Sequence, residues 1–280
     1  MSNNVEQQKP ILVLGGTGKT GRRVAERLKI RGLPVRIGSR SGQPPFDWSN
    51  PATWTPALDG VGAVYISYYP DVAAPGGVEA VSSFARVAMA NGVRRLVLLS
   101  GRGEPEAEEA EAAVRASGAD LTILRATWFA QNFSEGFMLE PVQQGVIALP
   151  AGNTPEPFVD LDDIADVAVA ALTEDGHIGQ LYELTGPRLL TFDEVTEEIA
   201  QVTGREIRYV PISIEAYATA ATEQGLPGEV VDLLRYLFGV VLDGRNARLG
   251  DGVERALGRP PRDFREYARA AAATGVWAAA

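Results

Sequence analysis

The most constraining feature of this 280-residue chain is a glycine-rich turn that directly follows a short apolar run. Residues 11–14 are typical of a buried parallel strand, and Gly15, Gly18 and Gly21 follow at intervals of three. An amphipathic helical pattern begins there. This is the context of a dinucleotide-binding turn, in which glycines let the backbone approach a pyrophosphate and the helix N-terminus offers N–H groups. A glycine-rich turn without a ligand is the alternative, but three such glycines lower stability unless something uses them.

The same stretch contains Gly18-Lys19-Thr20, which resembles the end of a nucleotide-hydrolysing P-loop. A P-loop has the spacing G-x-x-x-x-G-K-[ST], so its first glycine would stand at position 13, where this chain has Val13. The spacing excludes a P-loop. Lys19 and Thr20 are therefore expected on a dinucleotide turn, where Lys19 lies near the cofactor phosphates.

The end of the second predicted strand indicates which dinucleotide binds. An acidic residue there binds the ribose of NAD, whereas an arginine accommodates the 2′-phosphate of NADP. This chain has Gly38-Ser39-Arg40 and no acid nearby, which favours NADP(H). A solvated surface role for Arg40 is the alternative. The cofactor-binding residues expected from these motifs are Gly15, Thr17, Gly18, Lys19, Thr20, Gly21, Ser39 and Arg40.

Composition narrows the class of protein. The net charge is −10 without a concentrated basic tract, which disfavours a nucleic-acid partner. There is no cysteine, so disulfides, thiolate nucleophiles and cysteine metal sites are excluded. The polar first ten residues and the absence of a long apolar run predict a cytoplasmic protein that does not enter membranes. A small-molecule substrate is the expected partner, and a homo-oligomer is compatible with the sequence.

Strands alternating with helices predict an α/β fold, a Rossmann-type doubly wound parallel sheet with a small, mostly helical C-terminal substrate lobe. The expected domains are 9–187, which binds NAD(P), and 188–280, with further cleft-lining segments at 127–160. The predicted strands are 11–14, 35–40, 62–69, 94–103, 119–126 and 179–187, with a hairpin or short strand at 145–152. The predicted helices begin after the first turn and cover 77–92, 104–118, 160–174, 191–204, 228–244 and 263–277. Residues 41–54 are expected to form a loop-like insertion, and Thr191 with Glu194 has the spacing of a capping box.

Several motifs in order resemble those of one protein family. They are GGTGKTGRRV, IGSRSG, FDWSNPATW, SGADLTILRATWFAQNF and FVDLDDIADVA. Together they resemble the NmrA-like atypical short-chain dehydrogenases, in particular the subgroup of ergot alkaloid reductases and their bacterial relatives. The resemblance covers roughly residues 10 to 275.

This resemblance implies an NADPH-binding oxidoreductase whose nicotinamide lies at the carboxyl edge of the sheet. It adds Ser67, Tyr68, Ser100 and Gly101 to the expected cofactor-binding residues. It places Trp128, Phe129 and Asn132 in the substrate pocket. Packing roles are the alternative for Tyr68 and Tyr69, and Phe133 and Phe137 are expected in the core.

The departure from the wider family bears on the chemistry. Ketone-reducing short-chain dehydrogenases commonly carry a Tyr-x-x-x-Lys pair on the helix after the Ser100 strand, but residues 101–117 contain neither Tyr nor Lys. Other NmrA-like proteins often carry a lysine on this helix, whereas this chain has Ala112 in the corresponding stretch and Arg115 nearby. The missing pair is compatible with reduction of an iminium or an activated alkene, and an iminium in particular becomes a neutral amine by hydride transfer without a proton donor.

For a carbonyl acceptor, the candidate catalytic residues are Ser100, Tyr68 and Tyr69. A non-catalytic redox sensor that binds NAD(P) and acts through protein partners is the alternative function, because a sensor also needs no Tyr-Lys pair.

Two further groups could suggest a metal or a nucleophilic site. Asp160, Asp162 and Asp163 precede an apolar helix, where capping of the helix N-terminus is the favoured role. His177 is the single histidine, in an expected turn. We therefore predict no metal site and no Ser-His triad.

Overall fold

The computed structural model describes residues 8–279, which divide into two compact units. The first unit comprises residues up to Arg125 with Ile164–Tyr182 and Arg255–Leu257, and the second comprises Ala126–Asp163, Glu183–Glu254 and residues from Gly258 on. The chain therefore passes between the units several times. Residues 126–163, which include the segments at 127–160 expected to line a cleft, belong to the second unit.

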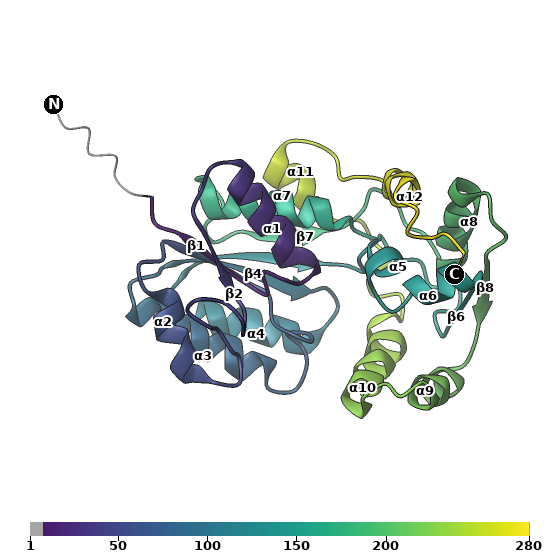
Figure 1. Cartoon of the computed structure of the whole chain (residues 1–280), viewed down its shortest axis with the longest axis horizontal. Coiled ribbons are helices and arrows are strands. Elements are labelled where there is room, and N and C mark those ends of the chain that lie inside the picture. The colour runs from purple at the N-terminus through teal and green to yellow at the C-terminus, as the bar shows by residue number, and fades with distance from the viewer. Residues whose placement is uncertain (1–7, 280) are drawn as a thin grey trace. The chain divides into compact units, whose positions relative to one another are not determined.

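The first unit is built on a six-stranded sheet with the strand order β2-β1-β3-β4-β5-β7 (Figure 1). The strands are β1 (Ile11–Leu14), β2 (Val35–Gly38), β3 (Ala63–Ile66), β4 (Arg95–Gly101), β5 (Asp120–Ala126) and β7 (Leu181–Leu184). Strand β1 pairs in parallel with β2 and β3, and β3 pairs in parallel with β4. Because the strand order reverses at β1, this is the predicted doubly wound α/β fold.

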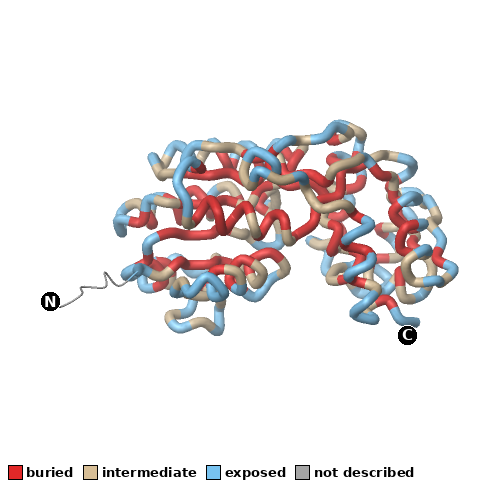
Figure 2. Tube along the Cα trace, turned by 90° about the horizontal axis from the view of Figure 1, so that it is seen from above, coloured by how far each residue is buried: buried red, intermediate tan, exposed pale blue. Residues whose placement is uncertain are grey.

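Helices cover both faces of this sheet, so its strands are apolar on both sides. Helices α1 (Lys19–Ile30) and α7 (Leu161–Thr173) lie on one face, and α2 (Trp54–Leu58), α3 (Gly77–Ala90) and α4 (Pro105–Arg115) lie on the other (Figure 1). All four residues of β1 are buried, and Figure 2 shows buried strands flanked by helices with exposed outer sides. Helix α1 packs through Val24 and Leu28, as its amphipathic pattern predicts.

The insertion after β2 has more structure than the predicted loop. It contains the 3₁₀ helix η1 (Pro51–Thr53) and runs into α2. The Asn50 side chain accepts a hydrogen bond from the Ala52 N–H, and the Trp54 indole N–H donates to the Asp47 carbonyl at 2.9 Å. Aromatic packing fixes the segment, since Trp48 lies 5.5 Å from the Phe84 ring.

The second unit is mostly helical, as predicted, but it also contains a two-stranded parallel sheet. Its helical segments are α5 (Asn132–Glu135), α6 (Leu139–Gln144), α8 (Phe192–Thr203), α9 (Ile214–Glu223), α10 (Gly228–Tyr236), the π-helical η2 (Leu237–Val241) and α12 (Phe264–Ala273). Helix α11 (Gly252–Leu257) includes residues of both units. Strand β6 (Val146–Leu149) pairs with β8 (Arg208–Pro211). The segment 145–152 is thus a strand and not a hairpin, and its partner β8 was not predicted.

Aromatic residues form the core of the second unit. Phe133, Phe192 and Trp277 are among its largest fully buried side chains, and the predicted core position of Phe133 is confirmed. The prediction for Phe137 is wrong, because 38% of this residue is exposed. The capping box of α8 is confirmed, since the Thr191 and Glu194 side chains bond to each other's backbone N–H.

Candidate functional site

The glycine-rich turn between β1 and α1 has the geometry that a phosphate cradle requires. Gly15 adopts a φ of 65°, in the left-handed region that favours glycine, and the Gly18 N–H donates to the Gly15 carbonyl at 2.8 Å. A side chain at Gly21 would overlap the Gly15 carbonyl oxygen, so the first turn of α1 lies directly against the turn. Among the described residues, no side chain caps the N-terminus of α1 at Gly18. This helix end is therefore suited to an anionic ligand.

The end of β3 lies beside this turn. A side chain at Gly15 would be 3.3 Å from the Cβ atom of Ser67. The sheet thus brings Gly15 and Ser67 together at the carboxyl ends of neighbouring strands, where Rossmann folds bind dinucleotides.

Thr20 faces the protein interior and not the turn's outer surface. It is buried, and its hydroxyl lies beside that of Tyr65. Burial raises the pKa of Tyr65, which is completely inaccessible to solvent. A packing role explains Thr20 better than phosphate binding, whereas Thr17 and Gly18 are exposed on the turn.

Ser39 and Arg40 follow β2 directly. Ser39 is half-buried, and its carbonyl accepts hydrogen bonds from the N–H groups of Gly42 and Phe46. Arg40 is exposed and lies near Asp47. Hydrogen bonds from Ser49 hold the pKa of the Asp47 carboxyl below its usual range, and the Arg40 charge lowers it further. The Arg40 guanidinium is thus at the surface, at the end of β2.

Tyr68 and Tyr69 have different surroundings. Tyr68 is half-buried and its ring lies 5.1 Å from the Trp48 ring, within the aromatic cluster of the insertion. Tyr69 is 81% exposed. Tyr68 therefore has a packing role, whereas the Tyr69 side chain is largely exposed to solvent.

Ser100 belongs to a buried polar network. Its hydroxyl donates to Glu111 Oε1 at 2.6 Å, and Arg125 Nε and Nη2 bind the same carboxylate at 2.9 and 2.5 Å. This bidentate pair joins α4 to β5 and leaves the Ser100 proton directed at Glu111. The arrangement argues against Ser100 as a proton donor to a substrate.

Glu104 and Asp71 form a carboxyl pair that the sequence analysis missed. Glu104 precedes α4 and is 6% exposed, and Asp71 follows β3 and is half-buried. A side chain at Gly101 would overlap the Glu104 carboxyl group, so this group lies against the end of β4. Burial and the neighbouring Asp71 carboxyl, with a smaller effect of Glu106, raise the pKa of Glu104 to about 9. Burial also raises the pKa of Asp71.

The sequence carried a signal for Glu104, but not for its pairing with Asp71. Residues 101–104 read GRGE, with an acid just before the helix that carries the Tyr-Lys pair in other enzymes. Glu104 lies outside the Tyr-x-x-x-Lys pattern, so that pattern does not indicate it.

The three predicted substrate-pocket residues lie in the second unit. Trp128 packs edge-on against Phe192 at 5.6 Å, Phe129 bridges to Val159, and Asn132 begins α5. Trp128 is 9% exposed, whereas Phe129 and Asn132 are half-buried.

The acidic residues before α7 have structural partners. The Asp160 carboxylate accepts from the Asp162 N–H at 2.8 Å and from Gln131 Nε2 at 2.7 Å, which confirms its capping role. Asp163 is fully buried and pairs with Arg259 and Arg262. His177 Nδ1 lies 2.9 Å from the Tyr182 hydroxyl. Among residues 8–279, no three metal-ligating side chains form a group that could hold a metal ion.

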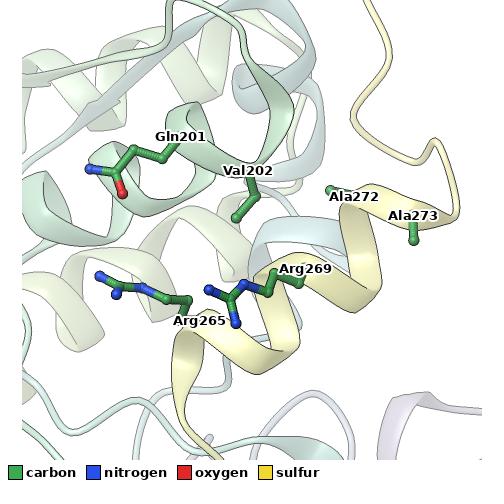
Figure 3. A pocket seen from close by; sticks show the side chains of 6 residues that line it. All are labelled: Gln201, Val202, Arg265, Arg269, Ala272 and Ala273. Atoms are coloured by element: carbon green, nitrogen blue, oxygen red, sulfur yellow. The ribbon is translucent and has the colours of Figure 1, made fainter.

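A cavity of about 570 Å³ lies between α8 and α12 of the second unit (Figure 3). It is lined by Gln201, Val202, Arg265, Arg269, Ala272 and Ala273. The Arg265 side chain is bound to the buried Glu198 at 3.2 Å. The cavity contains none of the predicted site residues.

Comparison with known proteins identifies the family. The profile of the NmrA-like family matches residues 106–267. The chain belongs to the NmrA-like family. Within it, the chain is 32% identical to agroclavine dehydrogenase of Claviceps fusiformis, over 92% of this chain and 95% of that protein. It is also 32% identical to an NAD(P)H azoreductase of Xenophilus azovorans, over 94% and 98% of the two chains.

A solved structure of an NADPH-dependent quinone oxidoreductase of Escherichia coli in complex with NADPH has the same fold. Its TM-score is 0.78 at 23% identity, covering 92% of this chain and 98% of that one. The predicted family, fold and class of enzyme, an oxidoreductase with NADP(H) as its cofactor, are confirmed by these matches. No helix among residues 8–279 is long and apolar enough to span a membrane.

Proposed function

We propose that this NmrA-like protein is an NADPH-dependent reductase of a small organic acceptor, which is an iminium, an activated alkene or a carbonyl compound. The observation that carries the proposal is the cradle at the carboxyl edge of the sheet. A side chain at Gly21 would overlap the Gly15 backbone, Gly15 itself adopts a left-handed φ of 65°, and the end of β3 lies beside the turn. When bound, NADPH supplies the hydride.

The residues of the first unit have separate roles in holding the cofactor. The turn at Gly15, Gly18 and Gly21 binds the pyrophosphate through backbone N–H groups at the start of α1. Ser39 and Arg40 bind the 2′-phosphate, because a guanidinium forms paired hydrogen bonds with phosphate oxygens. Ser67 and Gly101, at the ends of β3 and β4, lie beside the nicotinamide.

Acceptor binding is assigned to Trp128, Phe129 and Asn132 of the second unit. Phe129 provides partly exposed apolar aromatic surface, Trp128 packs in the aromatic core of the second unit, and the Asn132 amide provides both a donor and an acceptor. The place of action that we propose is the cytoplasm, and the reaction requires no macromolecular partner.

A panel of acceptors tests the proposal. Purified protein is mixed with NADPH and, separately, with a cyclic iminium, an enone, a quinone and an azo dye, and the loss of NADPH absorbance is followed. We expect steady turnover with at least one class, and NADPH favoured over NADH. Saturable NADPH binding without turnover on any acceptor would contradict the proposal and favour the redox sensor.

A further inference from the structure

We propose that the Glu104–Asp71 carboxyl pair donates the proton when this enzyme reduces a carbonyl or activated-alkene acceptor. This role rests on the reductase function proposed above. In the absence of a Tyr-Lys pair, this carboxyl pair would be the proton donor, and Glu104 directly precedes the same helix, α4.

The position of Glu104 is the first argument. Its carboxyl group fills the space left by the absent side chain of Gly101, the last residue of β4. The carboxyl ends of β3 and β4 are where a doubly wound sheet presents its ligands. Glu104 therefore stands beside the edge at which we place the nicotinamide. Ser100 lies one residue before Gly101, but its proton is directed at Glu111.

The hydrogen bonding of Glu104 is the second argument. Its side chain is hydrogen-bonded to Asp71, and Asp71 Oδ1 also accepts from the Ala73 N–H at 2.9 Å. The second carboxyl oxygen, Oε2, is buried and has no hydrogen-bond partner among the described residues. A buried polar atom without a partner costs free energy and is normally avoided. An acceptor oxygen bonded to Glu104 would remove this cost.

The protonation state suits a donor at neutral pH. The charged groups that act on Glu104 are Asp71 and Glu106, both acidic, and together with burial they keep the Glu104 proton bound. Two carboxyl groups in contact cannot both ionise readily, so the pair holds one proton between them. A carboxylic acid kept neutral by its surroundings is an effective general acid.

The reaction balances in atoms and electrons. The hydride from NADPH forms a C–H bond at the electrophilic carbon, and the π electron pair moves to the carbonyl oxygen or the α-carbon. That atom takes the proton from Glu104, which is left as a carboxylate. Because Asp71 is half-buried, Glu104 regains a proton from water by way of Asp71. An iminium acceptor becomes a neutral amine by hydride transfer alone.

The difference between acceptors gives the test. Wild type, Glu104→Gln and the control Glu109→Gln, an exposed residue of α4, are compared on an enone and on a cyclic iminium. Since general acids contribute about 10²-fold or more, Glu104→Gln should lower kcat/KM on the enone about a hundredfold. Its kcat/KM on the iminium should stay within about twofold of the wild-type value, because this reduction needs no general acid. Glu109→Gln should behave as wild type.

Other outcomes overturn the proposal in distinguishable ways. Equal losses on both acceptors, or no loss on either, would remove the donor role and leave the reductase function intact. If wild type reduces neither these nor the other acceptors of the panel, the proposed function fails and the donor role fails with it.

The pH dependence gives a readout independent of turnover. The pKa of Glu104 is raised from 4.5 to about 9 in the folded protein. The folded state therefore holds a proton that the unfolded state has lost between these values. The free energy of unfolding should thus fall as pH rises from 4.5 towards 9. Urea unfolding at several pH values should show a smaller decline in Glu104→Gln than in wild type, and identical declines would contradict the assignment.

A second variant covers the case in which Glu104→Gln does not fold. Asp71→Asn removes the neighbouring charge, so the pKa of Glu104 should fall. Enone reduction should then be lost at a lower pH than in wild type, while iminium reduction is unchanged. An unshifted pH profile on the enone would overturn the role of the pair.

Discussion

At the scale of single residues, we expect the charge of Arg40, just after β2, to set the preference for NADPH over NADH. Arg40 is exposed directly after β2, and its charge acts on the neighbouring Asp47. A guanidinium in this place can bind the 2′-phosphate of NADPH, and NADH lacks this phosphate.

Replacing Arg40 tests this preference. Arg40→Ala should raise KM for NADPH about 10- to 100-fold, since a hydrogen bond to a charged group contributes about 1.5–3 kcal/mol. KM for NADH should remain nearly unchanged. Steady-state kinetics with both cofactors measure the effect, and Lys29→Ala, an exposed residue at the end of α1, is the control. Equal changes with the two cofactors would remove Arg40 from the phosphate site.

At the scale of elements, the contact between the turn and α1 depends on glycine. A side chain at Gly21 would overlap the Gly15 backbone, whereas a side chain at Gly228, in the first turn of α10, would meet no atom within 4 Å. Both positions are glycines, but Gly21 is in close contact with backbone atoms whereas Gly228 has open space around it.

This contrast makes a second prediction. Gly21→Ala should destabilise the protein by about 1–3 kcal/mol and weaken NADPH binding, because the helix must move away from the turn. Gly228→Ala should be neutral or stabilise the protein by about 0.5–1 kcal/mol. Urea unfolding and calorimetric titration with NADPH measure both effects. Unchanged NADPH affinity in Gly21→Ala would show that the turn does not hold the cofactor.

The network between α4 and β5 makes a third prediction. Arg125→Ala leaves the buried Glu111 carboxylate without its bidentate partner, which should cost about 3–5 kcal/mol of the free energy of unfolding. Arg115→Ala, at an exposed position of α4, should change it by less than about 0.5 kcal/mol. A small loss in Arg125→Ala, measured by urea unfolding, would mean that water replaces the guanidinium.

Elements with strong local signals were predictable from the sequence. The strands β1, β3, β4 and β5 and the capping box of α8 depend on residues that are close together in the sequence, and the structure confirms them. Strand β8 was missed because its pattern over Arg208–Pro211 is mixed and its pairing with β6 joins residues about sixty positions apart. Within the candidate site, spacing alone located the glycines. The Glu104–Asp71 pair was not predictable in this way, since its two members come together only through the sheet.

At the scale of the whole molecule, cofactor binding and stability are linked. A ligand that binds only the folded protein adds about 2.7 kcal/mol to the free energy of unfolding when its concentration is a hundred times its Kd. NADPH should therefore raise Tm more than NADH does at equal concentration, and Arg40→Ala should reduce the difference. Equal shifts of Tm in the wild-type protein would contradict the proposed preference.

We propose that a hydride passes from NADPH to a small organic acceptor held by this protein. The test uses an acceptor that is turned over and NADPH that carries deuterium at the transferring position of nicotinamide C4, with mass spectrometry of the product. We predict one deuterium at the carbon that becomes reduced, and with an enone one further proton that exchanges with water before transfer. A product without deuterium from either face of the labelled cofactor would contradict the claim.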